Sequence, residues 1–202
     1  MTNQRYTLLC LGDSYTIGES VMIHESFPYQ VVQALREKGI EFIGPEILAK
    51  TGWTTDELLS AINGYRFLKG YDWVTLLIGV NNQYRGRDSS NYRSELEVLM
   101  KKAIQLAGGH SNHVIVLSIP DWGVTPFADG RDRARISREI DQFNEVKREM
   151  AGTLRVHYID ITQGTREAVE GSPWIAADGL HPSSREYTRW AVAVSGLIDS
   201  HL

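Results

Sequence analysis

Short runs of continuously apolar residues alternate along this chain with longer segments of helical periodicity. The runs are rich in Val, Ile, Leu and Tyr and are bounded by Gly, Pro or Asp. They lie at residues 6–11, 71–78, 114–119 and 154–161, with a weaker run at 40–48. Continuous apolarity, as opposed to strict alternation, predicts strands that are covered on both faces.

The segments between these runs place apolar residues three or four positions apart, which predicts amphipathic helices. These helices are expected around residues 27–39, 54–62, 92–109, 136–150 and 183–198. Two of them open with a hydroxyl residue followed three positions later by glutamate, Thr54 with Glu57 and Ser183 with Glu186. This spacing predicts a capping box at each of the two helix starts.

Strands that alternate with helices of this length are typical of βαβ units. We therefore predict an α/β fold in which a parallel sheet is covered by helices on both faces. The chain of 202 residues contains no internal repeat, no low-complexity tract and no Pro/Ser-rich linker. A single domain over residues 1–202 is the expected organisation.

Composition and charge exclude several classes of protein. Hydrophobic residues make up 42% and charged residues 23%, as in an average soluble globular chain and unlike a disordered or collagen-like one. The net charge of -4 leaves no broad basic footprint for nucleic acid, and no polybasic cluster suits an anionic membrane. Cys10 is the single cysteine, so an internal disulfide or a cysteine-rich metal site is excluded.

No apolar stretch approaches the length of a membrane span, and the run at residues 8–11 is too short for the core of a signal peptide. We therefore expect a cytoplasmic protein. In a parallel sheet, ligands bind outside the carboxyl ends of the strands. The loops expected at that edge are residues 12–19, 50–55, 79–86, 120–130 and 172–182.

Gly12-Asp13-Ser14-Tyr15 follows the first apolar run directly. A serine in this position projects into the expected site, and a helical turn that begins there leaves its backbone N–H free for an anion. The same residues also suit a tight turn in which the serine only caps a helix. The place of Ser14 after the first strand makes it a candidate nucleophile.

Asp178-Gly179-Leu180-His181-Pro182 lies just before the last predicted helix. A serine nucleophile requires an imidazole that accepts its proton and a carboxylate that holds the imidazole in the right tautomer. Asp178 lies three residues before His181, within reach of the ring's Nδ1. Alone, this segment is equally consistent with an Asx turn; together with Ser14 it supplies a complete triad.

Two other loops contain candidate hydrogen-bond donors for an oxyanion. Gly52 has no Cβ and can bring its backbone N–H close to a ligand. Asn81 follows the apolar run at 71–78 and carries a side-chain amide that can donate to an oxyanion. Each also has a plainer interpretation, as a turn glycine and as an asparagine that caps a turn.

Together these blocks resemble the SGNH hydrolases, also called the GDSL esterase/lipase superfamily. That family is defined by Ser, Gly, Asn and His in four separated blocks. They occur here in order as Gly12-Asp13-Ser14, Gly52, Gly79-Val80-Asn81-Asn82 and Asp178-Gly179-Leu180-His181. The match spans residues 8–182, and although no single block is specific, four in order are.

The resemblance implies a three-layer α/β/α sandwich on a flavodoxin-like, five-stranded parallel sheet. It implies that Ser14 is the nucleophile, that His181 is the general base and that Asp178 orients the base. The oxyanion hole would consist of the backbone N–H groups of Ser14 and Gly52 and the side-chain amide of Asn81. No cofactor and no metal are expected.

The sequence departs from the family pattern at two positions. The third block usually reads Gly-x-Asn-Asp, and Asn82 stands where the aspartate is expected. This change leaves Asn81 in place but removes a charge from the loop. The first block contains Tyr15 in place of leucine, which alters a packing residue and not the nucleophile.

Aromatic residues in the loops at the expected site are candidates for a substrate pocket, in which they could wall an acyl group or stack on a sugar, or simply anchor their loops. They are Trp53, Tyr84, Trp122, Phe127 and Trp174. The remaining chemically interesting residues are interpreted as structural: His110 and His113 in a solvated turn, His157 in a strand, and residues 131–138 on a solvated helix face.

We therefore expect a serine esterase that hydrolyses small, short-acyl esters through an acyl-enzyme on Ser14, because a chain of this length has little material for a lid. The expected partner is a small-molecule ester, with no nucleic acid and no membrane span. The alternatives are a lysophospholipase or thioesterase of the same superfamily, a non-catalytic flavodoxin-like binding module, and a metal-dependent phosphatase.

Overall fold

A computed structural model describes residues 5–167 and 173–202 of the chain. Among them, five strands form one sheet in the order β2-β1-β3-β4-β5, and every neighbouring pair is parallel. The strands are β1 (Leu8–Gly12), β2 (Glu46–Ala49), β3 (Trp73–Leu77), β4 (Val114–Leu117) and β5 (His157–Ile159). The predicted flavodoxin-like sheet is confirmed.

The three central strands are buried on both faces, whereas the edge strands β2 and β5 are only partly buried. This difference explains the sequence pattern. The central strands read as continuous apolar runs because helices cover both of their faces. The run at 40–48, whose end overlaps β2, is weaker because an edge strand meets solvent.

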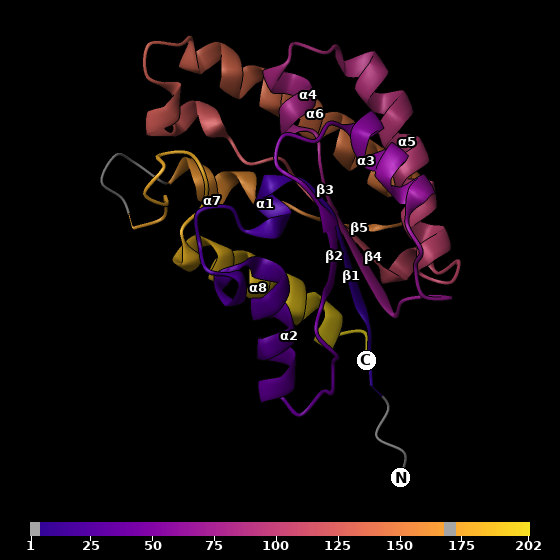
Figure 1. The fold of residues 1–202 in the computed structure, drawn as a ribbon. Helices are drawn as coiled ribbons and strands as arrows, with labels where there is room; N and C mark the ends of the chain where they lie inside the picture. The colour runs from indigo at the N-terminus through magenta and orange to yellow at the C-terminus, as the bar shows by residue number, and fades with distance from the viewer. Residues whose placement is uncertain (1–4, 168–172) are drawn as a thin grey trace.

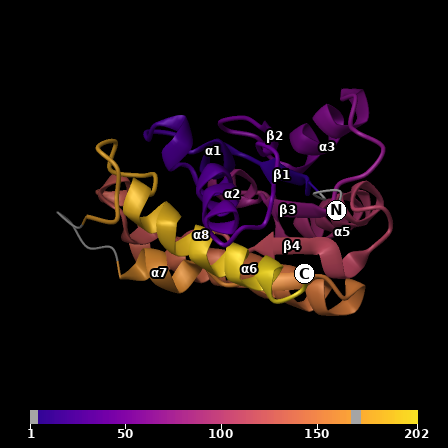
Figure 2. The same cartoon turned by 90° about the horizontal axis from the view of Figure 1, so that it is seen from below.

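Long helices form a layer on each side of the sheet, as Figures 1 and 2 show. On one side α2 (Phe27–Glu37) packs against α8 (Ser184–Asp199). On the other side α5 (Ser89–Leu106) packs against both α3 (Thr55–Gly64) and α6 (Arg133–Leu154). The chain therefore has the predicted three-layer α/β/α architecture.

Short helices and turns occupy the loops after the strands, except η2, which lies between α5 and β4. The α-helical ones are α1 (Ser14–Ile17), α4 (Val80–Tyr84) and α7 (Thr162–Arg166). The 3-10 turns are η1 (Ile23–Glu25), η2 (Ser111–His113), η3 (Trp122–Val124) and η4 (Pro126–Ala128). Each is too short to produce a periodic apolar pattern, so periodicity alone does not reveal them.

Two local predictions were wrong. The apolar run at 154–161 was predicted as one strand, but α6 extends to Leu154 and β5 covers only His157–Ile159. The capping box forms at Thr54 and Glu57 but not at Ser183 and Glu186. The Ser183 hydroxyl donates to the Pro173 carbonyl (2.6 Å), and Glu186 is buried and accepts from Trp190 (2.9 Å). Tertiary partners outcompete the local cap at this helix.

The strand order reverses direction at β1, which lies between β2 and β3. Ligand sites in doubly wound sheets form where the order reverses, outside the carboxyl ends of the strands. The segments that leave β1 and β3 at this point are α1 and α4, which lie at the upper end of the sheet in Figure 1. Within the described part of the chain, no helix combines the length and the apolarity needed to cross a bilayer.

Candidate active site

The first loop brings Ser14 to the carboxyl end of β1. The chain passes so close to β3 that a Cβ on Gly12 would lie 2.3 Å from the Leu77 carbonyl oxygen, so only glycine fits there. Asp13 caps α1 by accepting from the Tyr15 N–H at 3.1 Å. Ser14 is thus the first helical residue and not the cap, and its side chain is free to turn toward the site.

Ser14, His181 and Asp178 form a hydrogen-bonded relay. His181 Nδ1 lies 2.6 Å from Asp178 Oδ2, and His181 Nε2 lies 3.0 Å from Ser14 Oγ. An ionised carboxylate can only accept, so the ring proton sits on Nδ1, and Nε2 is left to accept the Ser14 hydroxyl proton. Ser14 and His181 are both largely buried, at 5% and 7% exposure.

Asp178 is held in its ionised form. Partial burial raises the pKa of this carboxyl, but hydrogen bonds from the Ser20 hydroxyl, the His181 ring and the backbone N–H groups of Leu180 and His181 outweigh burial and lower the pKa to about 2. The two backbone bonds measure 2.9 and 3.0 Å to Oδ1. The expected Asx-type turn therefore exists, and it orients the carboxylate toward the ring.

The three candidate oxyanion donors come from separate loops. Asn81 lies on α4 and lines the same cavity as Ser14. Its Nδ2 donates one hydrogen to the Trp53 carbonyl at 3.0 Å, which leaves the second amide hydrogen for a ligand. In the described part of the chain, no residue accepts the backbone N–H of Ser14 or of Gly52.

The segment that contains Gly52 is tied to the site from several sides. Gly52 takes a left-handed conformation with φ of +82°, and its carbonyl accepts from Arg85 at 2.6 Å. Thr51 donates to Glu19 in the loop after α1, and Trp53 accepts from Asn81. Gly52 itself is not a lining residue of the cavity beside Ser14.

A cavity of about 190 Å³ opens beside Ser14 and His181. Of the aromatic pocket candidates, Tyr84, Trp122 and Phe127 line it. Trp53 and Trp174 do not: Trp53 packs against the core, and Trp174 lines a smaller adjoining hollow of about 20 Å³. The hollow that Trp174 lines also includes His181 and Trp122, so it adjoins the cavity directly. Ser172, at the start of the last loop, lies outside the described residues.

Arg131 is solvent-exposed, as the sequence interpretation expected, but it also contacts the cavity wall. Its guanidinium lies over the three cavity rings, 5.2 Å from the centroids of Tyr84 and Trp122 and 5.1 Å from that of Phe127. It also donates to the Tyr84 hydroxyl at 3.2 Å. Cation–π contact of this kind holds the aromatic wall together.

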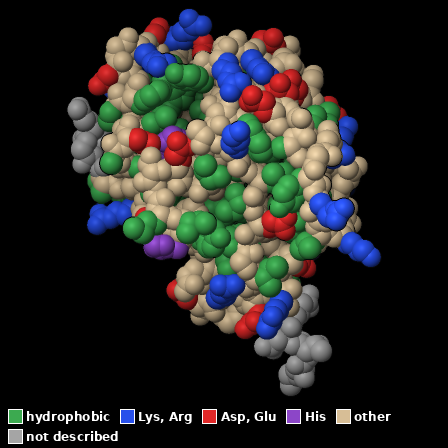
Figure 3. Space-filling view, viewed as in Figure 1, with side chains coloured by type: hydrophobic (Ala, Val, Ile, Leu, Met, Phe, Trp, Pro, Cys, Tyr) green, Lys and Arg blue, Asp and Glu red, His purple; other side chains and the backbone are tan. Residues whose placement is uncertain are grey.

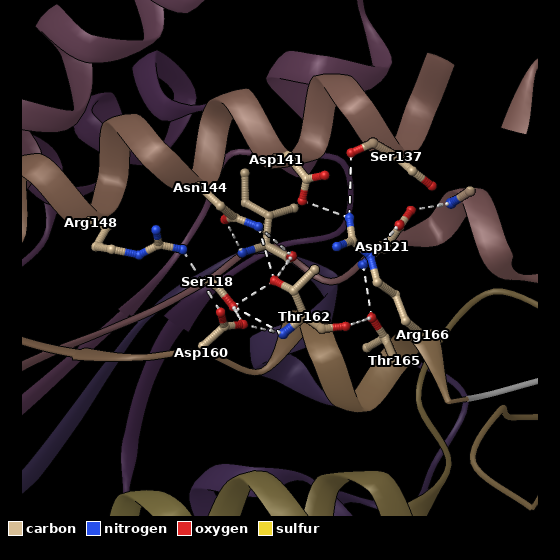
Figure 4. Close-up of polar contacts among 12 residues, drawn as sticks. Ser118, Asp121, Ser137, Asp141, Asn144, Arg148, Asp160, Thr162, Thr165 and Arg166 are labelled. Carbon is tan, nitrogen blue, oxygen red and sulfur yellow. Dashed lines mark hydrogen bonds and ion pairs between the residues drawn. The ribbon is translucent and has the colours of Figure 1, made fainter. Parts of the chain in front are cut away.

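A polar network fixes the segment that leads into Trp122 (Figure 4). The Asn144 side chain pairs with both backbone groups of Ile119, at 2.6 and 3.0 Å. Buried Asp121 accepts from the Gly123 N–H at 2.9 Å and pairs with Arg166 at 2.9 Å. Because α6 and α7 supply these partners, the Trp122 wall of the cavity is attached to rigid elements.

Comparison with known proteins agrees with this geometry. The family model for the GDSL-like Lipase/Acylhydrolase family matches residues 10–189. The chain belongs to this family. It is therefore a carboxylic ester hydrolase of the SGNH/GDSL type. No curated protein sequence is significantly similar to it.

Solved structures of the GDSL type share the fold. The crystal structure of TesA is 20% identical with a TM-score of 0.76, over 97% of this chain and 99% of that one. A lipase/acylhydrolase from Enterococcus faecalis is 22% identical with a TM-score of 0.76, over 98% and 97%. The acetylxylan esterase Axe2 from Geobacillus stearothermophilus is 20% identical with a TM-score of 0.74, over 98% and 96%.

The departure of this GDSL sequence at Asn82 has a structural explanation. Asn82 is fully buried, its Oδ1 accepts from the Thr55 N–H (3.1 Å), and its Nδ2 donates to the Thr55 hydroxyl (2.6 Å). The Thr55 hydroxyl in turn donates to Glu95. Because the Thr55 hydroxyl already donates its hydrogen to Glu95, it can only accept from residue 82. An ionised aspartate at position 82 could not donate to it, whereas the asparagine amide can.

One buried charged group beneath the site was not found from the sequence. Lys147 is completely buried, and its Nζ donates to the carbonyls of Ile78 (3.0 Å) and Leu117 (2.8 Å), at the ends of β3 and β4. Burial lowers its pKa to about 7, against the opposing charge of Asp13. The one available signal was its position on the apolar stripe of the predicted helix. In all other respects Lys147 looks like an ordinary surface lysine in the sequence.

The histidines remote from Ser14 lie at the other end of the sheet. His113 stacks on Trp73 with ring centroids 4.9 Å apart, and the His157 ring lies 4.7 Å from that of His201. Among the described residues, no group of three His, Cys, Asp or Glu side chains is placed to hold a metal ion. On the face of the molecule drawn in Figure 3, acidic and basic side chains are mixed.

Proposed function

We propose that this GDSL hydrolase is a serine esterase that acts on small, short-acyl esters through an acyl-enzyme on Ser14. The relay from Asp178 through His181 to Ser14, beside a cavity at the carboxyl end of the sheet, is the observation that supports this proposal. Ser14 Oγ attacks the ester carbonyl while His181 Nε2 takes its proton. Asp178 holds the ring tautomer and stabilises the imidazolium.

The tetrahedral intermediate then collapses with breakage of the ester C–O bond, and His181 returns the proton to the departing alcohol. Water, deprotonated by the same ring, attacks the acyl-enzyme, and the carboxylic acid and free Ser14 are regenerated. The developing oxyanion is stabilised by the Asn81 amide and by the backbone N–H groups of Ser14 and Gly52. These donors are already held by the loops that carry them, so little reorganisation is needed.

The size of the cavity supports a short acyl group. Its volume of about 190 Å³ is close to that of a cavity of about 150 Å³ that holds one benzene molecule. An acetyl group or a similarly short acyl chain fits such a space together with part of the alcohol. The three aromatic rings of its wall suit stacking on a sugar ring, and the structurally similar Axe2 is an acetylxylan esterase.

Ser14→Ala tests the catalytic assignment. The hydroxyl contributes little packing, so the variant should fold normally while kcat/KM for 4-nitrophenyl acetate falls on the order of 10³-fold or more. A fluorophosphonate probe should label wild-type Ser14 and leave the variant unlabelled. A folded variant that retains a tenth of wild-type activity contradicts the assignment, and absence of labelling in folded wild-type protein favours the non-catalytic binding module.

The lysophospholipase or thioesterase alternative differs in acyl length. A series of 4-nitrophenyl esters from acetyl to dodecanoyl should show kcat/KM falling once the chain exceeds the cavity, and acetylated sugars then test the alcohol. A maximum at long chains supports the alternative. Activity abolished by exhaustive EDTA treatment would instead indicate metal-dependent chemistry. The cytoplasmic location stays a prediction from sequence.

A further inference from the structure

Ser20 makes an unusual contact with the triad from a loop that the family blocks do not include. Its hydroxyl donates to Asp178 Oδ2 at 2.6 Å, across 158 residues of sequence. The same carboxylate oxygen accepts from His181 Nδ1 at 2.6 Å. Ser20 and the imidazole therefore share one acceptor atom, and any change in the hydroxyl alters the charge that faces the ring.

The backbone at Ser20 is in a conformation that serine rarely adopts. Its φ is +68°, and only Arg155 shares a positive φ among the described residues other than glycine. Ser20 occupies the third position of a turn over residues 18–21, closed by the Val21 N–H to the Gly18 carbonyl at 3.3 Å. Glycine or asparagine is favoured at such a position. Backbone strain of this kind clusters at functional sites, and at Ser20 the strained residue contacts the triad directly.

Resting on the proposed function, we propose that Ser20 is a positioning residue that sets the orientation and basicity of the Asp178–His181 pair. Its hydroxyl fixes the carboxylate rotamer so that Oδ2 faces Nδ1. It also withdraws negative charge from Oδ2, which limits how strongly Asp178 stabilises the protonated ring. Loss of the hydroxyl would return that charge to the carboxylate and strengthen its hold on the protonated ring.

Other ionisable groups near the pair are common to all variants of Ser20. Asp13, Glu19 and Asp121 act on Tyr15 or Tyr187, which also feel the charge of Asp178, and Glu186 lines the same hollow as His181. Burial raises the pKa of Asp13 to about 7 and also raises that of Glu186. Burial also raises the pKa values of the phenols Tyr15 and Tyr187, so both stay neutral across the working range. A shift of the pH profile between Ser20 variants therefore reports on the relay itself.

Ser20→Gly separates the side chain from the backbone strain. Glycine accepts the positive φ, so Tm should rise by about 2–4 °C. Loss of one hydrogen bond to a charged group should nevertheless lower kcat/KM about tenfold. Ser20→Ala should lose the same activity without the gain in Tm. Arg155→Gly, which relieves a positive φ at the end of α6, is the matched control and should raise Tm with unchanged activity.

The pH profile supplies a readout that a merely structural role would not move. In Ser20→Ala and Ser20→Gly the acid limb of kcat/KM should move to higher pH by about half a unit or more, because the carboxylate regains its full charge. Ser20→Asn suits the positive φ and carries an N–H donor, so it should recover most of the rate and return the limb toward its wild-type position.

Two outcomes overturn the proposal. One is that Ser20→Ala and Ser20→Gly stay within twofold of wild type with an unmoved acid limb. The other is a loss of rate that Ser20→Asn does not reverse and that leaves the limb in place. Fluorophosphonate labelling of Ser14 tests the proposed function separately, and titration of the His181 ring by NMR follows the effect of Ser20 without any turnover. A labelled Ser14 with an unchanged ring titration thus refutes this inference alone.

Discussion

At the scale of single residues, Asn81 and Asn82 show how adjacent identical side chains are given different tasks. Asn81 lines the cavity and has one amide hydrogen that is not used by the Trp53 carbonyl. Asn82 is buried, and both ends of its side-chain amide are hydrogen-bonded to Thr55. Under the proposed function Asn81 would face the reacting carbonyl, whereas Asn82 joins α4 to the start of α3. A helix places consecutive residues about 100° apart, so neighbours in sequence need not share surroundings.

Alanine at each position should separate the two tasks. Asn81→Ala should lower kcat by about 10² to 10³ with little change in KM or Tm, as expected for loss of an oxyanion donor. Asn82→Ala should lower the free energy of unfolding by about 1–3 kcal/mol, because the buried Thr55 N–H loses its acceptor, while kcat falls much less. Steady-state kinetics and urea unfolding measure both. Equal, small rate losses in the two variants would show that Asn81 is not the donor.

At the scale of elements, the position of α4 depends on how the chain leaves β3. Gly79 precedes α4 with φ of +127°, and a Cβ there would lie 2.7 Å from the Tyr92 ring and 2.9 Å from Ile119. Tyr92 also donates to the Ile78 carbonyl at 3.2 Å. Strand β3, helix α5 and the segment after β4 thus converge on one glycine, and they determine where α4 presents Asn81.

Gly79→Ala should therefore damage both stability and catalysis. Backbone strain and overpacking together should cost about 3 kcal/mol, equivalent to a fall in Tm of roughly 6–12 °C. The turnover rate should fall as well, because α4 must shift to make room. Gly86→Ala is the control: its φ is +68° but nothing lies within 4 Å of the added Cβ. If thermal unfolding gives the same small loss for both variants, close packing at Gly79 is not important.

At the scale of the whole molecule, an acid and a base, Asp13 and Lys147, are both buried beneath the active site. Burial raises the pKa of Asp13 to about 7, although the Tyr15 N–H and the charge of Lys147 act in the opposite direction. Burial likewise lowers the pKa of Lys147 to about 7. Between pH 3.8 and 7 the folded protein retains a proton on Asp13 that the unfolded chain releases. The contribution of Asp13 to the free energy of unfolding is therefore largest at low pH and declines as the pH rises through that window.

Asp13→Asn removes this titration. As the pH rises from 5 to 8, the free energy of unfolding of the variant should increase by roughly 2 kcal/mol relative to that of wild type. The reason is that only the wild type must ionise a buried carboxyl over this range. Urea unfolding at the two pH values measures the difference. Glu37→Gln, on the exposed end of α2, is the matched surface control for a carboxyl-to-amide change. A constant difference for Asp13→Asn would mean that Asp13 is ionised throughout this range.

The sequence by itself was sufficient to predict the parallel sheet, its covering helices and the four family blocks. These features are local: a strand buried on both faces must be apolar throughout, and a helix between two layers must repeat its apolar residues every three or four positions. Ser14 could be placed because it comes just after a predicted strand, and Asp178 could be paired with His181 because they are three positions apart in the sequence.

The tertiary structure decided what depends on contacts between distant segments. It placed Tyr84, Trp122 and Phe127 around the cavity beside Ser14 and Trp174 in the adjoining hollow. It paired Ser20 with Asp178, buried Lys147 beneath the strand ends and gave the Ser183 hydroxyl a partner other than its own helix. No local pattern specifies such contacts, because a side chain's partner is set by the packing of whole elements, and tertiary hydrogen bonds can outweigh a local cap.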